Sequence, residues 1–137
     1  MKDELILYQE LLGLIAPEQI INNFELSSIQ EKKGSITLVF EEKESLVPDD
    51  LQGKEVVNDG FMNPVELQTF PLNDKKLYLS IRRRRWKEKG TSGPSYSNKY
   101  ELHRKGMKTT NEFGDFLKEE LGLSPDKFNR FWEDTTH

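Results

Sequence analysis

Alternating apolar and polar residues mark the middle of this chain as β-structure. Leu77, Leu79 and Ile81 alternate with polar neighbours between Lys76 and the arginines that follow, and a period of two indicates a half-buried strand. An earlier pair of extended runs, roughly 24–32 and 35–43, meets at Lys33-Gly34 and predicts a hairpin. A second hairpin, from Val65 to Trp86, is expected to turn around 72–75.

The ends of the chain change to helical spacing. Residues 3–15 carry Leu5, Tyr8, Leu12 and Ile15 on one predicted face with Leu11 beside it, and a second short helix follows Pro17. Near the C-terminus, Thr109 and Glu112 fit a capping box for a helix over about 109–121. Gly122, Ser124 and Pro125 then predict a stop and a new start, and the second helix would carry Phe128, Phe131 and Trp132.

These elements predict one α+β domain over residues 1–137. We expect an antiparallel sheet of about four or five strands, N-terminal helices and a C-terminal helical hairpin over about 109–134. The hairpin should pack through Phe113, Phe116 and Leu117 against Phe128, Phe131 and Trp132. The last three are also the candidate partner-docking residues. The apolar content of 34% and charged content of 32% indicate a thin core.

Composition excludes several classes of chemistry. The chain has no cysteine, which excludes disulfides, thiolate nucleophiles and zinc sites built on sulfur. Its first residues are acidic where a signal peptide is basic, and no apolar run is as long as a membrane span. We therefore expect a soluble, cytoplasmic protein that has no contact with a membrane.

A run of four arginines closed by a tryptophan, Arg82 to Trp86, concentrates positive charge. The window 75–108 holds twelve Lys and Arg against two acids, whereas the whole chain carries a net charge of −4. The residues outside the window therefore carry a net charge of −14. Such asymmetry is typical of polyanion recognition. The alternative is a solvated basic strand over which the acids fold.

Enzymatic signals are weak, and we expect no catalytic residue, cofactor or metal. The two histidines, His103 and His137, form no metal-binding spacing, and no nucleophile or phosphate-loop motif is present. Adjacent acids such as Glu41-Glu42 are interpreted as solvated surface groups.

A basic β-hairpin over about 65–104 is the candidate nucleic-acid-binding element. Arginine donors suit phosphates, and an aromatic ring can stack on a base or pack under a guanidinium. Trp86 could equally close the end of the sheet. We expect Leu77, Leu79 and Ile81 to be buried, and Arg82 and Arg84 to be mostly exposed. The candidate binding residues are Arg82, Arg83, Arg84, Arg85, Trp86, Lys99, Arg104, Lys105 and Lys108.

Two segments, 70–86 and 105–118, carry a family resemblance. With the opening helix and the strand end at Phe40-Glu41-Glu42-Lys43, they resemble the N-terminal region protein of ISAon-family insertion-sequence transposases. The chain is also similar to the N-terminal region of ISL-type transposases, but it lacks their zinc cysteines. The resemblance implies DNA handling at transposon ends beside a separately encoded catalytic subunit, with Arg82–Arg85 as the matching basic strand.

The leading hypothesis is therefore a non-catalytic, DNA-binding N-terminal or accessory component of a split insertion-sequence transposase. Its expected partners are transposon-end DNA, the catalytic transposase subunit and, in a homo-oligomer, a second copy. The alternative is a protein-interaction or regulatory module without nucleic-acid binding, in which the arginines are compensated internally and the acidic remainder meets a basic partner.

Overall fold

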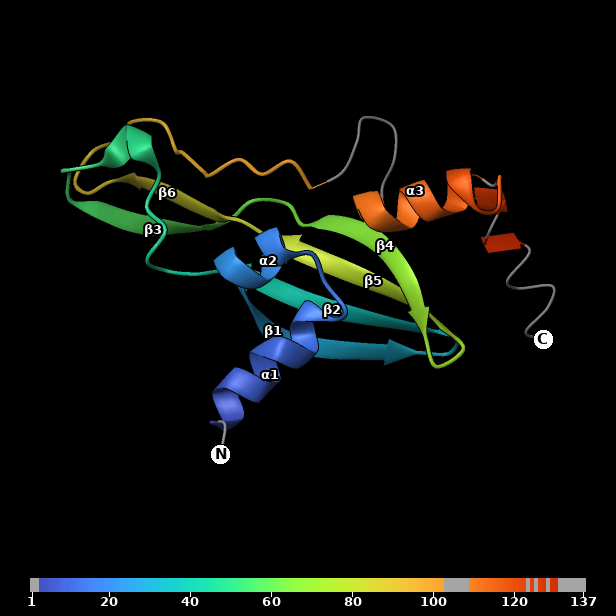
Figure 1. Ribbon diagram of the computed structural model, residues 1–137. Coiled ribbons are helices and arrows are strands. Elements are labelled where there is room, and N and C mark those ends of the chain that lie inside the picture. The colour runs from blue at the N-terminus through green and yellow to red at the C-terminus, as the bar shows by residue number, and fades with distance from the viewer. Residues whose placement is uncertain (1–2, 103–108, 123, 125, 128, 131–137) are drawn as a thin grey trace.

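The computed structural model describes residues 3–102, 109–122, 124, 126–127 and 129–130, and these form an α+β arrangement (Figure 1). The helices are α1 (Glu4–Gly13), α2 (Glu18–Asn23), the 3₁₀ helix η1 (Asp49–Leu51) and α3 (Asn111–Glu119). The strands are β1 (Phe24–Lys32), β2 (Ser35–Glu42), β3 (Val56–Phe61), β4 (Val65–Leu72), β5 (Lys75–Arg82) and β6 (Arg84–Glu88).

The main sheet has the order β1-β2-β5-β4 and is mixed, so the prediction of an antiparallel sheet was wrong in one pairing. Both hairpins, β1–β2 and β4–β5, are antiparallel, but β2 and β5 run parallel with Glu41 opposite Arg82. The connection 43–64 leaves and re-enters the sheet at the same end. Strand β4 therefore runs opposite to β2, and its return strand β5 pairs parallel to β2 between them.

Both predicted hairpins are confirmed, and their turns explain why. Gly34 has a φ of 81°, and Asn73 and Asp74 have φ values of 49° and 63°. This left-handed conformation suits glycine, asparagine and aspartate, and two such residues make the tight turn that matches strand twist. The local chemistry of these loops thus sets both registers.

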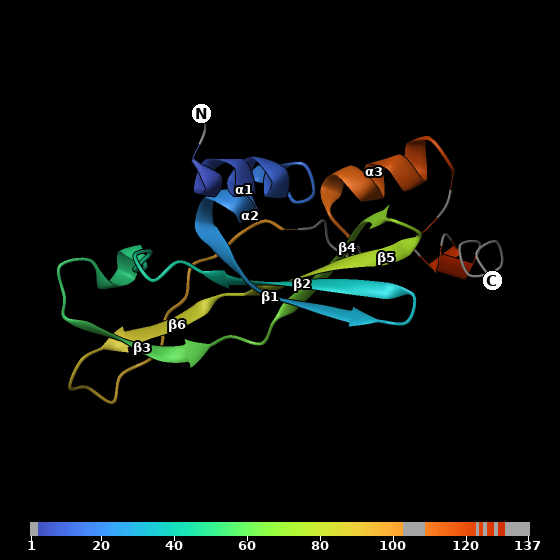
Figure 2. The same cartoon turned by 90° about the horizontal axis from the view of Figure 1, so that it is seen from below.

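Strands β3 and β6 form a separate two-stranded sheet. We call residues 54–61 and 84–89 the arm, because Figures 1 and 2 show this ribbon extending from one end of the main sheet. The basic hairpin, expected to extend to about residue 104, forms no strand between β6 and residue 102. Tyr96 makes an isolated bridge to Trp86, and the partner of β6 is β3.

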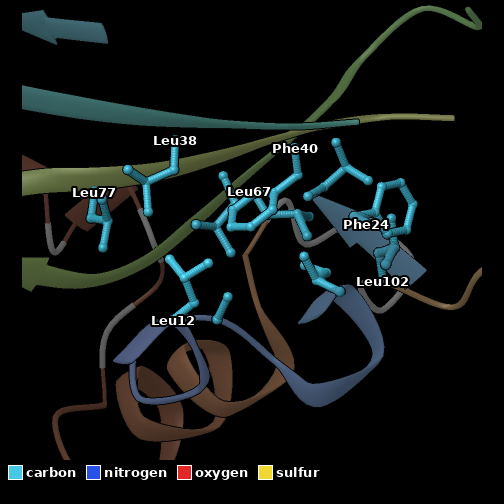
Figure 3. Close-up of a cluster of buried hydrophobic side chains, with 11 residues drawn as sticks. Leu12, Phe24, Leu38, Phe40, Leu67, Leu77 and Leu102 are labelled. Carbon is cyan, nitrogen blue, oxygen red and sulfur yellow. The ribbon is translucent and has the colours of Figure 1, made fainter. Parts of the chain in front are cut away.

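The core lies between the main sheet and the N-terminal helices, and Figure 3 shows side chains from both meeting there. Leu77, Leu79 and Ile81 are buried, as predicted. The buried apolar residues of this cluster are Leu12, Ala16, Ile20, Phe24, Leu38, Phe40, Leu67, Leu77, Leu79, Ile81 and Leu102. All three α-helices cover the same face of the sheet in Figure 2.

The two short N-terminal helices form where predicted, but the expected apolar face of the first is not buried. Within α1, every residue of which is described, only Leu12 is buried. The predicted face residues Leu5, Tyr8 and Leu11 are 44–60% exposed. Helical spacing shows which side chains share a face, but the sheet surface reaches only the C-terminal turn of α1.

At the other end, α3 packs on β4, and the predicted helical hairpin is not supported. The helix is capped by Thr110, whose hydroxyl accepts the Phe113 N–H at 3.3 Å, and not by Thr109 as predicted. Thr109 instead bridges to Gln68 of β4, which moves the helix start by one residue. One helix is supported there; Phe128, Phe131 and Trp132, the predicted docking residues, lie outside the described residues.

Candidate nucleic-acid interface

The four arginines lie at the junction between the main sheet and the arm. Strand β5 ends at Arg82, β6 begins at Arg84, and Arg83 joins them. The chain thus passes from one sheet into the other within this run. Because side chains alternate along an extended chain, Arg82 and Arg84 lie on the same side of this run. Both guanidinium groups cover the ring of Phe61, at 4.4 and 4.9 Å from its centroid.

Glu42 organises this junction from the end of β2. Its side chain is 0% exposed, and a buried carboxylate needs several donors to offset the loss of water. One oxygen accepts the Arg84 backbone N–H at 2.9 Å. The other accepts the Asn98 amide at 3.0 Å and the Tyr100 hydroxyl. Two segments distant in sequence, at Arg84 and at 98–100, are thereby tied to the end of β2.

The remaining arginine contacts neutralise or anchor the run. Arg82 forms an ion pair with Glu41 at 2.8 Å. The Arg84 guanidinium lies 3.7 Å from the Glu44 carboxylate, and its Nε donates to the Glu42 carbonyl at 2.6 Å. Arg83 donates to the Asn98 carbonyl at 3.1 Å. Arg85 donates to the Asp59 carbonyl at 2.8 Å, and its Nε lies 3.6 Å from that residue's carboxylate. The arginines therefore contact acids and carbonyls of β2, β3 and the segment after Tyr96.

The expectation that Arg82 and Arg84 are mostly exposed was wrong, most clearly at Arg84. The Arg84 side chain is 13% exposed and that of Arg82 is 38% exposed. Parallel pairing of β2 with β5 brings Glu41 and Glu42 beside the arginines, although the pairs are about forty residues apart in sequence. The strand carrying four cations is accommodated because acids meet it on the neighbouring strand.

The interpretation of Glu41-Glu42 as solvated surface groups was wrong for Glu42, which is buried, although the sequence carries a signal for it. Ile36, Leu38 and Phe40 alternate with other residues along one strand. Continued by two positions, the same alternation places Glu42 on their side of β2. A glutamate at the end of an inward-facing series indicates a buried carboxylate, and hence partners elsewhere in the chain.

The contact with Glu42 also changes the ionisation of Tyr100. Burial, followed by the hydrogen bond to the Glu42 carboxylate, raises the pKa of Tyr100 above its ordinary value of 10.0. A phenolate there would face the carboxylate at close range. The Tyr100 hydroxyl therefore remains a donor through the neutral range.

Trp86 lies inside the arm. Its side chain is 6% exposed, and its backbone exchanges two hydrogen bonds with Tyr96, at 2.8 and 2.6 Å. Of the two predicted roles, this placement favours packing, because stacking on a base would require the arm to open.

The lysines are placed differently from the arginines. Lys89 and Lys99 are exposed and Lys87 is half-buried. Along β6, period two places Arg85, Lys87 and Lys89 on the side opposite Trp86. Within the part of the chain that the structure describes, no carboxylate lies within ion-pair distance of Lys87, Lys89 or Lys99. Arg104, Lys105 and Lys108, the other predicted binding residues, lie outside the described residues.

Among the described residues, no group of three or more histidine, aspartate or glutamate side chains is placed to hold a metal ion. None of the described helices combines the length and the apolar character needed to cross a bilayer.

Comparison with known proteins adds nothing to this geometry. The chain matches no family model, no curated protein and no solved structure.

Proposed function

We propose that this protein is a non-catalytic, DNA-binding accessory component of a split insertion-sequence transposase, and that the arm contacts the DNA backbone. The observation that carries the proposal is the row Arg85, Lys87 and Lys89 on one side of β6, with Lys99 exposed nearby in sequence. Exposed cations on a projecting ribbon can reach phosphates without rearrangement of the fold.

The spacing of this row suits a nucleic-acid strand. Residues two apart on a β-strand are separated by about 6.6 Å, and one DNA strand carries a phosphate for each 3.4 Å or so of helix axis. Successive cations of the row therefore advance by about two phosphates. Contacts of this kind supply affinity and salt dependence but carry no base information.

The arginine run has a different part in this proposal from the one its sequence indicated. Arg82 and Arg84 hold the arm to the main sheet through Glu41, Glu42 and Phe61. Their task is to set the direction of the arm. The lysines, which lack acidic partners among the described residues, are the groups left to meet phosphate.

The family resemblance supplies the biological setting. It supports transposon-end DNA as the nucleic acid and a catalytic transposase subunit as the protein partner, in the cytoplasm. It rests on segments 70–86 and 105–118, the first of which contains the junction and most of β6.

The test is the salt dependence of binding to duplex DNA by the full chain. Three phosphate contacts, by Lys87, Lys89 and Lys99, predict a slope of log affinity against log salt of roughly −3. The triple variant Lys87→Gln, Lys89→Gln, Lys99→Gln should lose most of that slope. The matched control changes three exposed lysines elsewhere, Lys32→Gln, Lys33→Gln and Lys118→Gln, and should retain the full slope.

A second candidate function, a protein-interaction module without nucleic-acid binding, is favoured by a different observation. Acids of β2, β3 and the segment after β2 compensate Arg82, Arg84 and Arg85 inside the fold. If the wild type shows no salt-sensitive binding to duplex DNA, single-stranded DNA or RNA at low ionic strength, this second function replaces the first. Equal slopes in the triple variant and its control would also count against the arm.

A further inference from the structure

Helix α1 exposes an unusual amount of apolar surface. Leu12 anchors its C-terminal turn in the core at 8% exposure, whereas six large apolar residues on and just after the helix are 44–84% exposed. These are Leu5, Ile6, Leu7, Tyr8, Leu11 and Leu14. Single exposed apolar residues are ordinary, but a contiguous group on one short helix marks a binding surface.

A groove adjoins this surface. It has a volume of about 360 Å³ and runs between α1 and the first residues of β1, with walls formed by Leu5, Tyr8, Leu12, Phe24, Leu26 and Lys43 among others. In Figure 1 the N-terminal end of α1 lies outside the edge strand β1, so the helix leans away from the sheet. The groove and the exposed leucines form one continuous apolar surface, which we call the α1 surface.

The charge around the α1 surface is predominantly negative. Residues 3–26 contain five acids, Asp3, Glu4, Glu10, Glu18 and Glu25, and no lysine or arginine. Lys43 is the one cation among the described residues that line the groove. An apolar surface with an acidic rim favours a partner whose apolar residues are flanked by cations, because like charges at a rim repel.

This charge pattern argues against a second copy as the occupant. Two α1 surfaces placed face to face would bring two predominantly acidic segments together, with Lys43 of each copy as the one cation that lines the groove among the described residues. A basic partner meets the same rim with attraction and a faster encounter. An amphipathic helix that lays its apolar face into an apolar groove is a recurring mode of recognition.

We propose that the α1 surface binds an amphipathic helical segment of another protein, whose apolar stripe is flanked by lysine or arginine. The partner's apolar side chains at i, i+3 and i+4 lie in the groove and against Leu7 and Leu11, and its cations face Glu4 and Glu25. This interaction does not depend on nucleic-acid binding by the arm, which lies on other strands.

The experiment uses the full chain and two synthetic peptides. Each peptide has about 18 residues, long enough to hold a helix, with leucines at i, i+3, i+4 and i+7. One carries lysine at the flanking positions and the other carries glutamate. Calorimetric titration should show the lysine peptide binding at least about tenfold more tightly, with affinity that falls as salt is added.

Variants of the protein locate the site. Leu7→Ser with Leu11→Ser removes two exposed neighbours on one helix face and should weaken binding of the lysine peptide by roughly tenfold. Ile29→Ser is the matched control, because Ile29 on β1 is 58% exposed and does not line the groove; it should bind as the wild type does. Glu4→Gln with Glu25→Gln should reduce the salt dependence. Circular dichroism checks that each variant is folded.

Three outcomes would overturn the proposal. The lysine peptide fails to bind, the glutamate peptide binds equally well, or the Leu7 and Leu11 variant binds like the control. Sedimentation of the protein alone tests the other possible occupant, a second copy of the chain. Self-association that disappears in the Leu7 and Leu11 variant would assign the surface to a second copy and reject a basic partner. Each result is independent of the salt slope on DNA.

Discussion

Glu42 and Arg84 form the contact on which the junction depends most. Both are held inside the protein, and each completes the other's hydrogen bonding: the carboxylate accepts the Arg84 N–H, while the guanidinium donates to the Glu42 carbonyl. Removal of the Glu42 carboxylate would leave the buried donors that share it without their acceptor, and each unsatisfied donor costs about 1–3 kcal/mol. The adjacent Glu41–Arg82 pair is partly exposed and is expected to contribute far less.

The first prediction compares these two glutamates. Glu42→Ala should lower the free energy of unfolding by about 3–5 kcal/mol, because the Arg84 N–H, the Asn98 amide and the Tyr100 hydroxyl lose a shared acceptor, at about 1–3 kcal/mol for each unsatisfied group. Glu41→Ala should cost about 1 kcal/mol or less. Urea denaturation at neutral pH measures both values. Similar losses for the two variants would show that Glu42 does not hold the junction.

The second prediction concerns pH and Tyr100. Its pKa is raised in the folded protein, by burial and by the Glu42 hydrogen bond, above the 10.0 of an unperturbed tyrosine. Above about pH 10 the unfolded chain therefore releases a proton that the folded protein retains, and stability falls as pH rises. Tyr100→Phe abolishes this contribution, so its stability should decline less steeply across that range. Urea denaturation at a series of pH values from about 9 to 11 checks the difference, and parallel curves would contradict it.

At the scale of elements, the sequence predicted the strands and turns that depend on consecutive residues. Leu77, Leu79 and Ile81 identified β5 and its buried face, and Asn73-Asp74 identified its turn. Strand β3 was not predicted, and Asn58, Asp59 and Gly60 interrupt any alternation of apolar residues within it. In the structure Gly60 has a φ of 86° at a register shift, with an Arg85 nitrogen 3.5 Å from the site a Cβ would occupy. The strand is therefore recognisable only together with β6.

The candidate site was predictable to the same extent. The arginine run was located correctly, as was its alternation, because both are properties of consecutive residues. Its acidic neighbours were not, because the parallel β2–β5 pairing that places Glu41 beside Arg82 depends on a connection of some twenty residues. For α1 the failure is similar: the spacing of Leu5, Tyr8 and Leu12 describes a face, and only the tertiary structure determines whether anything covers it.

Over the whole molecule, the segregation of charge along the sequence is only in part a segregation in space. The basic window meets acids from 41–44 and from β3 at the junction, whereas the acids of 3–26 remain around α1. The positive remainder lies on the arm, and the acidic, apolar surface lies beside β1. The protein thus presents two surfaces of opposite character on different elements.

The arm and the main sheet also differ in how they are stabilised, and this leads to the last prediction. None of the arm's described residues belongs to the main apolar cluster, which is built from the N-terminal helices, the main sheet and Leu102. The arm is held chiefly by its own ladder, Trp86 and the polar junction at Glu42. We therefore expect it to open without unfolding of the main sheet, with β6 amides exchanging at least roughly 30-fold faster than those of β5, a difference of about 2 kcal/mol.

Hydrogen exchange measured by NMR in the wild type and two variants tests this. Glu42→Gln keeps the side-chain volume but replaces the charged acceptor of the Arg84 N–H, the Asn98 amide and the Tyr100 hydroxyl by a neutral amide. Exchange at Trp86 and Lys87 should therefore accelerate more than exchange at Leu79. Glu41→Gln is the matched control and should leave both strands nearly unchanged, because its pair with Arg82 is partly exposed. If β5 and β6 exchange at one rate and respond equally to Glu42→Gln, the arm and the main sheet form a single cooperative unit, and the junction is part of the global core.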